Sequence, residues 1–251
     1  MIRLISYKYK KRYIINGYKK GAISYDYERL PWNGCLGDKE KEKISKFLKH
    51  GIILECGVGT GRHALSFGND YTYVGIDLSY DMIKICKEKT RYMNRKIELI
   101  LCDAECLVFR KNIFDNLICS KTFKFFTSPL KFLEEAKFSL KKGGRCLITV
   151  EVLDSLWFRF VKRLNLKVPK HEKHYFINDG IDIFKQIGFS RIKVEPIANL
   201  FLGSYLFIWY VTYNSPLRQI FNKQISSFNK IIINFDKILS SRFLVLFIGE
   251  V

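Results

Sequence analysis

The residues best suited to chemistry form one short run, in which an acid is followed by alternating glycines. Glu55 ends the apolar segment 52–54, and the glycines that follow it are Gly57, Gly59 and Gly61. This order is typical of a buried strand, a tight turn and the start of a helix. Glycine is needed where a backbone turns sharply or lies against a ligand, because a Cβ would block either. The run therefore predicts a turn that holds a small molecule over a helix N-terminus.

The spacing of these glycines separates two kinds of ligand. Nicotinamide and flavin sites use the pattern G-x-G-x-x-G around a pyrophosphate, whereas this chain has G-x-G-x-G. Glu55 lies two residues before the first glycine, where a carboxylate would repel a pyrophosphate and suit a cationic ligand. A single turn of this kind also occurs without any ligand, so further motifs must decide.

The acid that ends the next apolar segment lies at the sequence distance expected of a ribose contact. Residues 71–76 predict a second strand that closes at Asp77, and Ser79 predicts the N-cap of a helix over 80–89. A carboxylate at that strand end can accept hydrogen bonds from both ribose hydroxyls. With the glycine run, this stretch resembles motifs I and II of the class I S-adenosylmethionine (SAM) dependent methyltransferases, in which the acid of motif I is associated with the amino-acid end of SAM.

A third motif follows the predicted strand 97–102, where Asp103 and Ala104 begin the string D-A-E. The resemblance implies that Asp103 accepts a hydrogen bond from the adenine amino group, while the Ala104 N–H meets a ring nitrogen. It covers residues 45–151 and points to the small-molecule branch that includes the ubiquinone and menaquinone C-methyltransferases. It implies SAM as cofactor, S-adenosylhomocysteine as product, and a cofactor site made of Glu55, Cys56, Gly57, Gly59, Gly61, Asp77, Leu78, Met82, Asp103, Ala104, Glu105 and Ser120.

The fold that this resemblance implies is α/β, with a Rossmann-like seven-stranded mixed sheet flanked by helices as an αβα sandwich. The last strand is expected to be antiparallel, and ligands should bind where the strand order reverses between strands one and four. One domain is expected, with an N-terminal arm or lid (1–44), a SAM-binding core (45–151) and an acceptor-side half (152–251). The remaining elements are expected as helices at 38–50, 129–140 and from Asn178 or Asp179 to Gly188, and as strands at 114–119, 145–150, 191–197 and 242–249.

The composition indicates which kinds of partner and which cellular compartment to expect. The formal charge of +19 favours an anionic partner such as nucleic acid, a phospholipid surface or an acidic substrate, although the codon bias of an AT-rich genome explains it equally well. The 7 cysteines include no C-x-x-C pair, which indicates a reduced, cytoplasmic protein without structural metal. Lysines interrupt any apolar N-terminal core, so no secretory signal is expected.

Three segments outside the core admit more than one interpretation. Residues 1–24 carry basic side chains and no acid, and could form a flexible arm, a solvated tail or, as we favour, a lid over SAM with Tyr25 near its mouth. The basic amphipathic segment 153–166 suits core packing or a membrane surface. His174, ahead of His171, is a candidate general base near neutral pH, although both histidines would also suit an exposed loop.

The insertion at about 199–241 separates the sixth strand from the seventh. Its first half is uncharged and aromatic, and its second half repeats a lysine every seven residues at Lys223, Lys230 and Lys237. Too many polar residues dilute it for a transmembrane helix. We expect helices that cap the acceptor pocket. Their other face could lie on an anionic bilayer, pack on the sheet or bury against a second subunit.

These patterns predict a SAM-dependent methyltransferase that acts on a small-molecule or lipid-like acceptor. Methyl transfer from SAM is an in-line displacement, so the protein mainly positions the acceptor and excludes water. No N/D-P-P-Y/F string follows the fourth strand and no Pro-Cys pair occurs there, which excludes the usual DNA amino- and cytosine-methylating classes. The alternatives are an RNA or protein acceptor, and a SAM-binding module without turnover.

Overall fold

The computed structural model describes residues 2–28, 36–93, 96–154, 173–199 and 242–251. His171 and nearly all of the two segments expected at 153–166 and 199–241 therefore lie outside the described residues.

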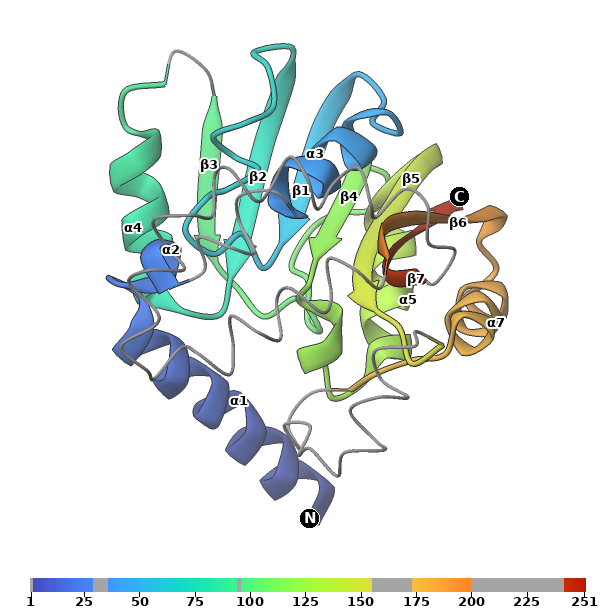
Figure 1. The fold of residues 1–251 in the computed structure, drawn as a ribbon, viewed down its shortest axis with the longest axis horizontal. Coiled ribbons are helices and arrows are strands. Elements are labelled where there is room, and N and C mark those ends of the chain that lie inside the picture. Colours follow the sequence, from blue (N-terminus) through green and yellow to red (C-terminus); the bar gives the residue numbers. More distant parts are fainter. Residues whose placement is uncertain (1, 29–35, 94–95, 155–172, 200–241) are drawn as a thin grey trace.

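A seven-stranded sheet with the order β3-β2-β1-β4-β5-β7-β6 forms the centre of the molecule (Figure 1). Strands β1 to β5 run parallel, whereas β7 lies antiparallel between β5 and β6. The expected mixed sheet with an antiparallel last strand is confirmed, and the strand order reverses between β1 and β4. The strands are β1 (Gly51–Cys56), β2 (Tyr71–Asp77), β3 (Ile97–Leu101), β4 (Phe114–Ser120), β5 (Leu140–Glu151), β6 (Ser190–Asn199) and β7 (Arg242–Glu250).

The helices match the predicted positions apart from their ends. Ser79 caps α4 as expected, with its side chain accepting from the Met82 N–H at 3.4 Å. The expected cap of α7 was wrong, because Phe176 is the N-cap and the Asp154 carboxylate accepts the Ile177 N–H instead. The helices are α1 (Ile2–Gly21), α2 (Tyr25–Glu28), α3 (Gly37–Ser45), α4 (Tyr80–Thr90), the 3-10 turn η2 (Phe123–Phe125), α5 (Pro129–Ser139) and α7 (Ile177–Ile187).

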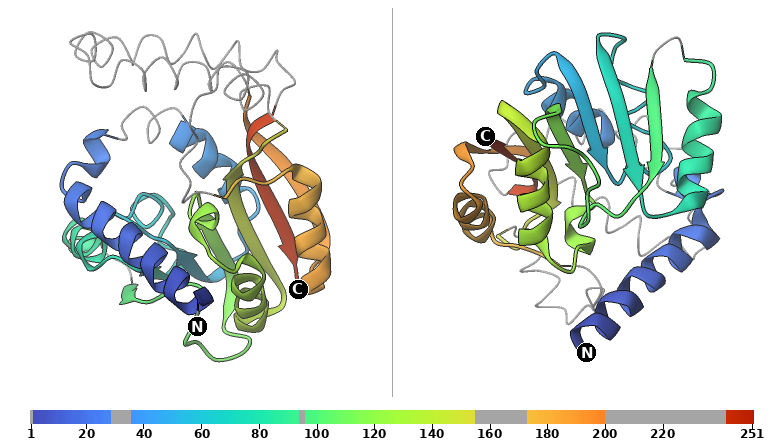
Figure 2. Two further views of the ribbon diagram at one scale, coloured as in Figure 1. Left: turned by 90° about the horizontal axis from the view of Figure 1, so that it is seen from below. Right: turned by 180° about the vertical axis from the view of Figure 1, so that it is seen from behind.

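Helices cover both faces of the sheet and make three layers (Figure 2). Side chains alternate along each strand, so Ile53 enters one apolar cluster and its neighbour Leu54 enters the other. The first cluster contains Ile44 of α3 and Cys86 of α4, and the second contains residues of α5 and α7. This arrangement leaves the carboxyl ends of the parallel strands free to hold a ligand.

The helix expected directly after the glycine run is not regular. Gly57, Gly59 and Gly61 all have positive φ, so the backbone is not right-handed until after Gly61. Only short turns follow, with the Leu65 N–H donating to the Gly61 carbonyl at 2.9 Å, before β2 begins. The prediction of a regular helix at this position was wrong, since the residues between Gly61 and β2 form only turns.

Strand β5 begins earlier than predicted. Leu140 pairs with Phe114 across a bulge, and this contact adds residues 140–144 to the expected strand.

Candidate active site

A cavity lies at the carboxyl ends of the parallel strands, and residues of α1 form part of its wall. Helix α1 runs past these strand ends (Figures 1 and 2). The empty space of the cavity, including the open mouth, is about 1070 Å3. Most residues expected around the cofactor line it, namely Glu55, Gly57, Gly59, Asp77, Leu78, Met82, Asp103, Ala104 and Ser120. Cys56, Gly61 and Glu105 are not among the lining residues; Cys56 and Glu105 are buried behind this wall.

Asp77 fastens the glycine turn to the end of β2. Its Oδ2 accepts from the Gly59 N–H at 2.9 Å, and its Oδ1 accepts from the Ser79 N–H at 2.8 Å. Burial raises the pKa of Asp77, and these two N–H groups partly oppose that rise. Each carboxylate oxygen has two acceptor sites, so Asp77 keeps capacity for further donors.

The glycines of the turn have different surroundings. A Cβ on Gly57 would collide with the Thr122 side chain, so the segment that follows β4 packs directly against the turn there. A Cβ on Gly59 would meet no atom within 4 Å, because this position faces the cavity. Gly57 is therefore needed for packing, and Gly59 leaves room for a ligand.

Lys11 of α1 joins this helix to the acids after β3. Its ammonium donates to Asp103 Oδ1 at 2.9 Å and pairs with Glu105. Glu105 also accepts from the hydroxyl of Thr127 at 2.9 Å. Burial would raise the pKa of Glu105, but the contacts with Lys11, together with hydrogen bonds from the Ser128 N–H and the Thr127 hydroxyl, outweigh it and the pKa is lowered. Glu105 thus anchors α1, whose Ile14, Ile15 and Tyr18 line the cavity.

Glu55 lies at the inner end of the cavity and is almost completely buried. One of its oxygens is 2.7 Å from His63 Nδ1, and the other accepts from the Tyr73 hydroxyl. The acid of the first motif therefore lines the site while two buried partners hold its carboxylate in place.

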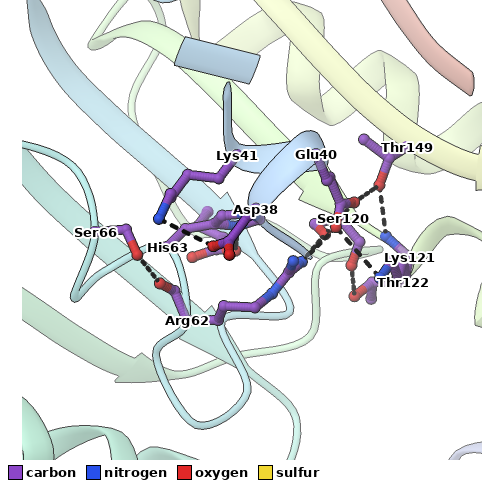
Figure 3. A network of polar contacts seen from close by, with 11 residues as sticks. Asp38, Glu40, Lys41, Arg62, His63, Ser66, Ser120, Lys121, Thr122 and Thr149 are labelled. Atoms are coloured by element: carbon purple, nitrogen blue, oxygen red, sulfur yellow. Dashed lines mark hydrogen bonds and ion pairs between the residues drawn. The ribbon is translucent and has the colours of Figure 1, made fainter. Parts of the chain in front are cut away.

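A cluster of polar side chains that we did not predict lies beside Ser120 (Figure 3). We call Glu40, Arg62, Ser120, Lys121 and Thr149 the Glu40 cluster. Glu40 is 0% exposed, and its carboxylate accepts from Arg62 Nη2 at 2.6 Å and from the Ser120 hydroxyl at 2.8 Å. Thr149 also donates to it, and the Lys121 ammonium lies 3.3 Å away. One sequence signal was available: an acid four residues before the buried Ile44, on the buried side of α3.

The pKa values of Glu40 and Lys121 each depend on the charge of the other residue. Burial would raise the pKa of Glu40, but the charges of Arg62 and Lys121 hold it well below its usual range. Burial lowers the pKa of Lys121 to about 8 despite the attraction of Glu40. Lys121 has φ 53, in the left-handed region that a residue with a side chain seldom adopts. Arg62 and Lys121 both line the cavity.

His174 does not line the cavity. Its two ring nitrogens are buried, and it precedes Tyr175, which forms an isolated bridge with Val152 after the end of β5. Its assignment as a general base stays a prediction.

Other chemical features of the described residues are few. Cys56, Cys119 and Cys146 are free thiols in the core, and burial raises the pKa of each. Within the described ranges, no group of three or more His, Cys, Asp or Glu residues could hold a metal ion. None of the helices that the structure describes is both long enough and apolar enough to cross a membrane.

Comparison with known proteins identifies the class. Residues 54–148 match the family model of the methyltransferase domain. The chain is 30% identical over 181 residues to an uncharacterized protein of Methanocaldococcus jannaschii, covering 71% of this chain and 83% of that one. It is also 30% identical over 175 residues to the demethylmenaquinone methyltransferase of Staphylococcus haemolyticus, covering 59% of this chain and 73% of that enzyme.

A solved SAM-dependent methyltransferase of Thermotoga maritima shares the fold, with a TM-score of 0.64 and 20% identity over 93% of this chain and 97% of that one. The chain belongs to the class I SAM-dependent methyltransferases. Within that class it resembles the quinone C-methyltransferases.

The residues around the cavity fit SAM, the cofactor of this family. Gly59 leaves open space beside the turn, and Asp77 presents a carboxylate with spare acceptor sites at the end of β2. Asp103 and Ala104 line the same cavity at the end of β3. Acceptors for hydroxyl and amino donors therefore surround one space that a nucleoside could fill.

Proposed function

We propose that this methyltransferase acts on a small-molecule or lipid-like acceptor with a substantial apolar surface. The observation that carries the proposal is the composition of the cavity wall that α1 and η2 supply. Ile14, Ile15 and Tyr18 come from α1, and Phe125 and Phe126 come from η2 and its end. Apolar side chains surround an acceptor most favourably when the acceptor is itself apolar.

The position of α1 supports the same proposal. Lys11 ties α1 to Asp103 and Glu105, so the helix narrows access to the cavity. A cavity that a helix partly covers suits a compact acceptor better than a polymer, which needs an open groove with basic and stacking residues. The relative from Staphylococcus haemolyticus, named a demethylmenaquinone methyltransferase, agrees with this choice of acceptor.

Within this proposal, the cofactor contacts follow the motifs. Asp77 accepts from the ribose hydroxyls, Asp103 accepts from the adenine amino group, and the Ala104 N–H meets a ring nitrogen. Gly57, Gly59 and Gly61 shape the turn beside the cofactor, with Leu78 and Met82 packing on it. Glu55 gives the inner end of the site a negative charge.

SAM supplies a methyl group that is already activated on a sulfonium. The chain then needs to bind the acceptor, orient it towards the methyl group and keep water out of the site. In this proposal α1 and the apolar wall perform these tasks. No side chain has to act as a nucleophile. If an acceptor proton must be removed, His174 is the candidate from the sequence, and His174→Gln tests whether turnover depends on it.

The acceptor class can be tested directly by incubating the purified chain with methyl-labelled SAM and a cell extract. We expect label in the organic-solvent fraction, insensitive to nuclease and protease. Label that nuclease or protease releases would contradict the proposal and favour an RNA or protein acceptor. Binding of SAM without any S-adenosylhomocysteine formed would indicate a module without turnover.

A further inference from the structure

The Glu40 cluster brings more positive than negative charge to the wall of the cavity. Arg62 and Lys121 both line the cavity, and both pair with the single carboxylate of Glu40. Glu40 itself is fully buried behind them. Two cations that share one buried anion leave a net positive charge facing the cavity.

Arg62 has an unused donor group in this position. Its Nη2 donates to Glu40 at 2.6 Å and to Ser120 at 2.9 Å. Its Nη1 is buried, and no described residue accepts a hydrogen bond from it. A buried guanidinium nitrogen without an acceptor is costly, so this nitrogen is expected to gain one when a ligand binds.

The backbone at Lys121 indicates that the cluster is built for a ligand. Lys121 holds φ 53 at the end of β4, and its N–H donates to the Thr149 carbonyl and hydroxyl at 3.1 Å each. A side chain in the left-handed region costs about 1 kcal/mol or more, and such strain concentrates at functional sites. This conformation accompanies the placement of the ammonium beside Glu40 in the cavity wall (Figure 3).

We propose that Arg62, supported by Lys121 and held by Glu40, binds the carboxylate of the amino-acid tail of SAM. A planar guanidinium is well matched to a carboxylate, and charge assistance strengthens the hydrogen bonds. The tail also carries an ammonium, and Glu55 lines the same cavity with a carboxylate. Opposite charges on the wall therefore match the two charges of an α-amino acid. The inference depends on SAM as the cofactor and not on the identity of the acceptor.

Two ligands that differ in the tail test this assignment by calorimetry. S-adenosylhomocysteine contains the amino-acid tail, whereas 5′-methylthioadenosine lacks it and keeps the nucleoside. Replacing Arg62 with Gln should weaken S-adenosylhomocysteine binding about tenfold or more and leave methylthioadenosine binding unchanged. Lys121→Gln should give a smaller loss of the same kind. Lys41→Gln, which removes a cation of α3 that pairs with Asp38 and does not line the cavity, is the control and should change neither affinity.

Calorimetry separates the subsite from partial unfolding, because misfolded protein lowers the apparent stoichiometry and leaves the affinity of the folded fraction unchanged. If Arg62→Gln does not fold, Lys121→Gln carries the comparison alone. Equal losses for both ligands, or no loss for either, would overturn the subsite. A wild-type chain that binds neither ligand would overturn the cofactor site as a whole.

Discussion

The cavity has two sides that are held together by different kinds of contact. On the Asp77 side, backbone N–H groups of Gly59 and Ser79 bond to one carboxylate, and they lie 18 and 2 residues from it in the chain. In the Glu40 cluster, side chains bond to side chains, and the partners of Glu40 include Ser120 and Thr149, which are 80 and 109 residues away.

The Asp77 side is therefore stabilised mainly by contacts between residues close in the chain, whereas the Glu40 cluster depends on contacts that form only with the whole fold. A turn that is tied by its own neighbours forms wherever its short sequence forms. A buried acid that serves two cations needs α3, the turn and β4 in place together, because each unpaired charge in the interior is costly. The two sides should therefore respond differently to single substitutions.

The largest expected loss of stability follows removal of the Glu40 carboxylate, which lies at the centre of the cluster. Glu40→Gln leaves Arg62 and Lys121 without their buried partner, and should lower the free energy of unfolding by about 3–5 kcal/mol. Urea denaturation measures it. Glu42→Gln on the same helix removes an exposed acid paired with Lys46, and should cost no more than about 0.5 kcal/mol. Similar losses in both variants would show that the cluster carries no special stability.

On the other side, Asp77→Ala should reduce binding more than stability. Loss of two charge-assisted bonds to a ribose is worth about 3 kcal/mol, which corresponds to a roughly hundredfold weaker affinity for SAM. Calorimetry with S-adenosylhomocysteine measures it. Asp81→Ala, in the first turn of α4 and outside the cavity lining, is the matched control. An unchanged affinity in Asp77→Ala would remove Asp77 from the site.

Substitutions of Gly57 and Gly59 should also separate an effect on stability from an effect on ligand binding. Gly57→Ala forces a methyl group into Thr122 and should destabilise the chain by about 2–3 kcal/mol through overpacking and strain. Gly59→Ala faces open space, so its stability cost should stay near 1 kcal/mol while its affinity for SAM falls. Thermal unfolding and calorimetry on both variants measure the two effects. Equal stability loss at both positions would contradict the assignment of Gly59 to ligand space.

The smallest expected effect concerns the attachment of α1. Lys11→Gln removes the ion pairs with Asp103 and Glu105, and should lower hydrogen-exchange protection of α1 amides by about 1–2 kcal/mol without changing the central strands. Lys19→Gln, an exposed lysine of the same helix, is the control.

The same contact should depend on pH. The pKa of Glu105 is lowered from 4.5 in the folded chain, so its contribution is present above pH 4.5 and lost as pH falls through the lowered value. Protection of α1 in the wild type should therefore decrease at acid pH towards that of Lys11→Gln. Protection that does not change with pH would rule out this ion pair as the anchor.

The contrast also explains which features the sequence alone could predict. The string from Glu55 to Glu105 encodes its structure locally, through glycines with positive φ, a cap at Ser79 and acids at strand ends, so most lining residues were predictable. The reversal of the strand order and the antiparallel last strand were expected only from the family resemblance. Glu40 gave only the weak signal of its spacing from Ile44, because its partners meet it only after the whole sheet has formed. In the sequence, Glu40 is one of several charged residues in the same predicted helix, and nothing else local distinguishes it from the others.

The cap of α7 was wrong for the same reason. Asn178 or Asp179 was expected to cap this helix from local preference, but Asp154, which is 23 residues away from Ile177, accepts the first N–H instead. His174, whose role as a general base stays a prediction, lies outside the cavity lining beside β5, which no local pattern indicated. Local patterns located the elements, and long-range contacts decided their ends and the surroundings of the site.

The place of β7 in the sheet has a consequence for synthesis on the ribosome. Residues Arg242–Glu250 lie between β5 and β6, and they pair with both. Strand β6 therefore emerges well before the strand that joins it to the sheet. At about 5–20 residues per second, the nascent chain waits for several seconds with the edge of β5 uncovered. During that interval β5 presents unpaired backbone groups to other chains. A newly made chain is therefore more vulnerable to aggregation than a folded chain, in which β7 covers this edge.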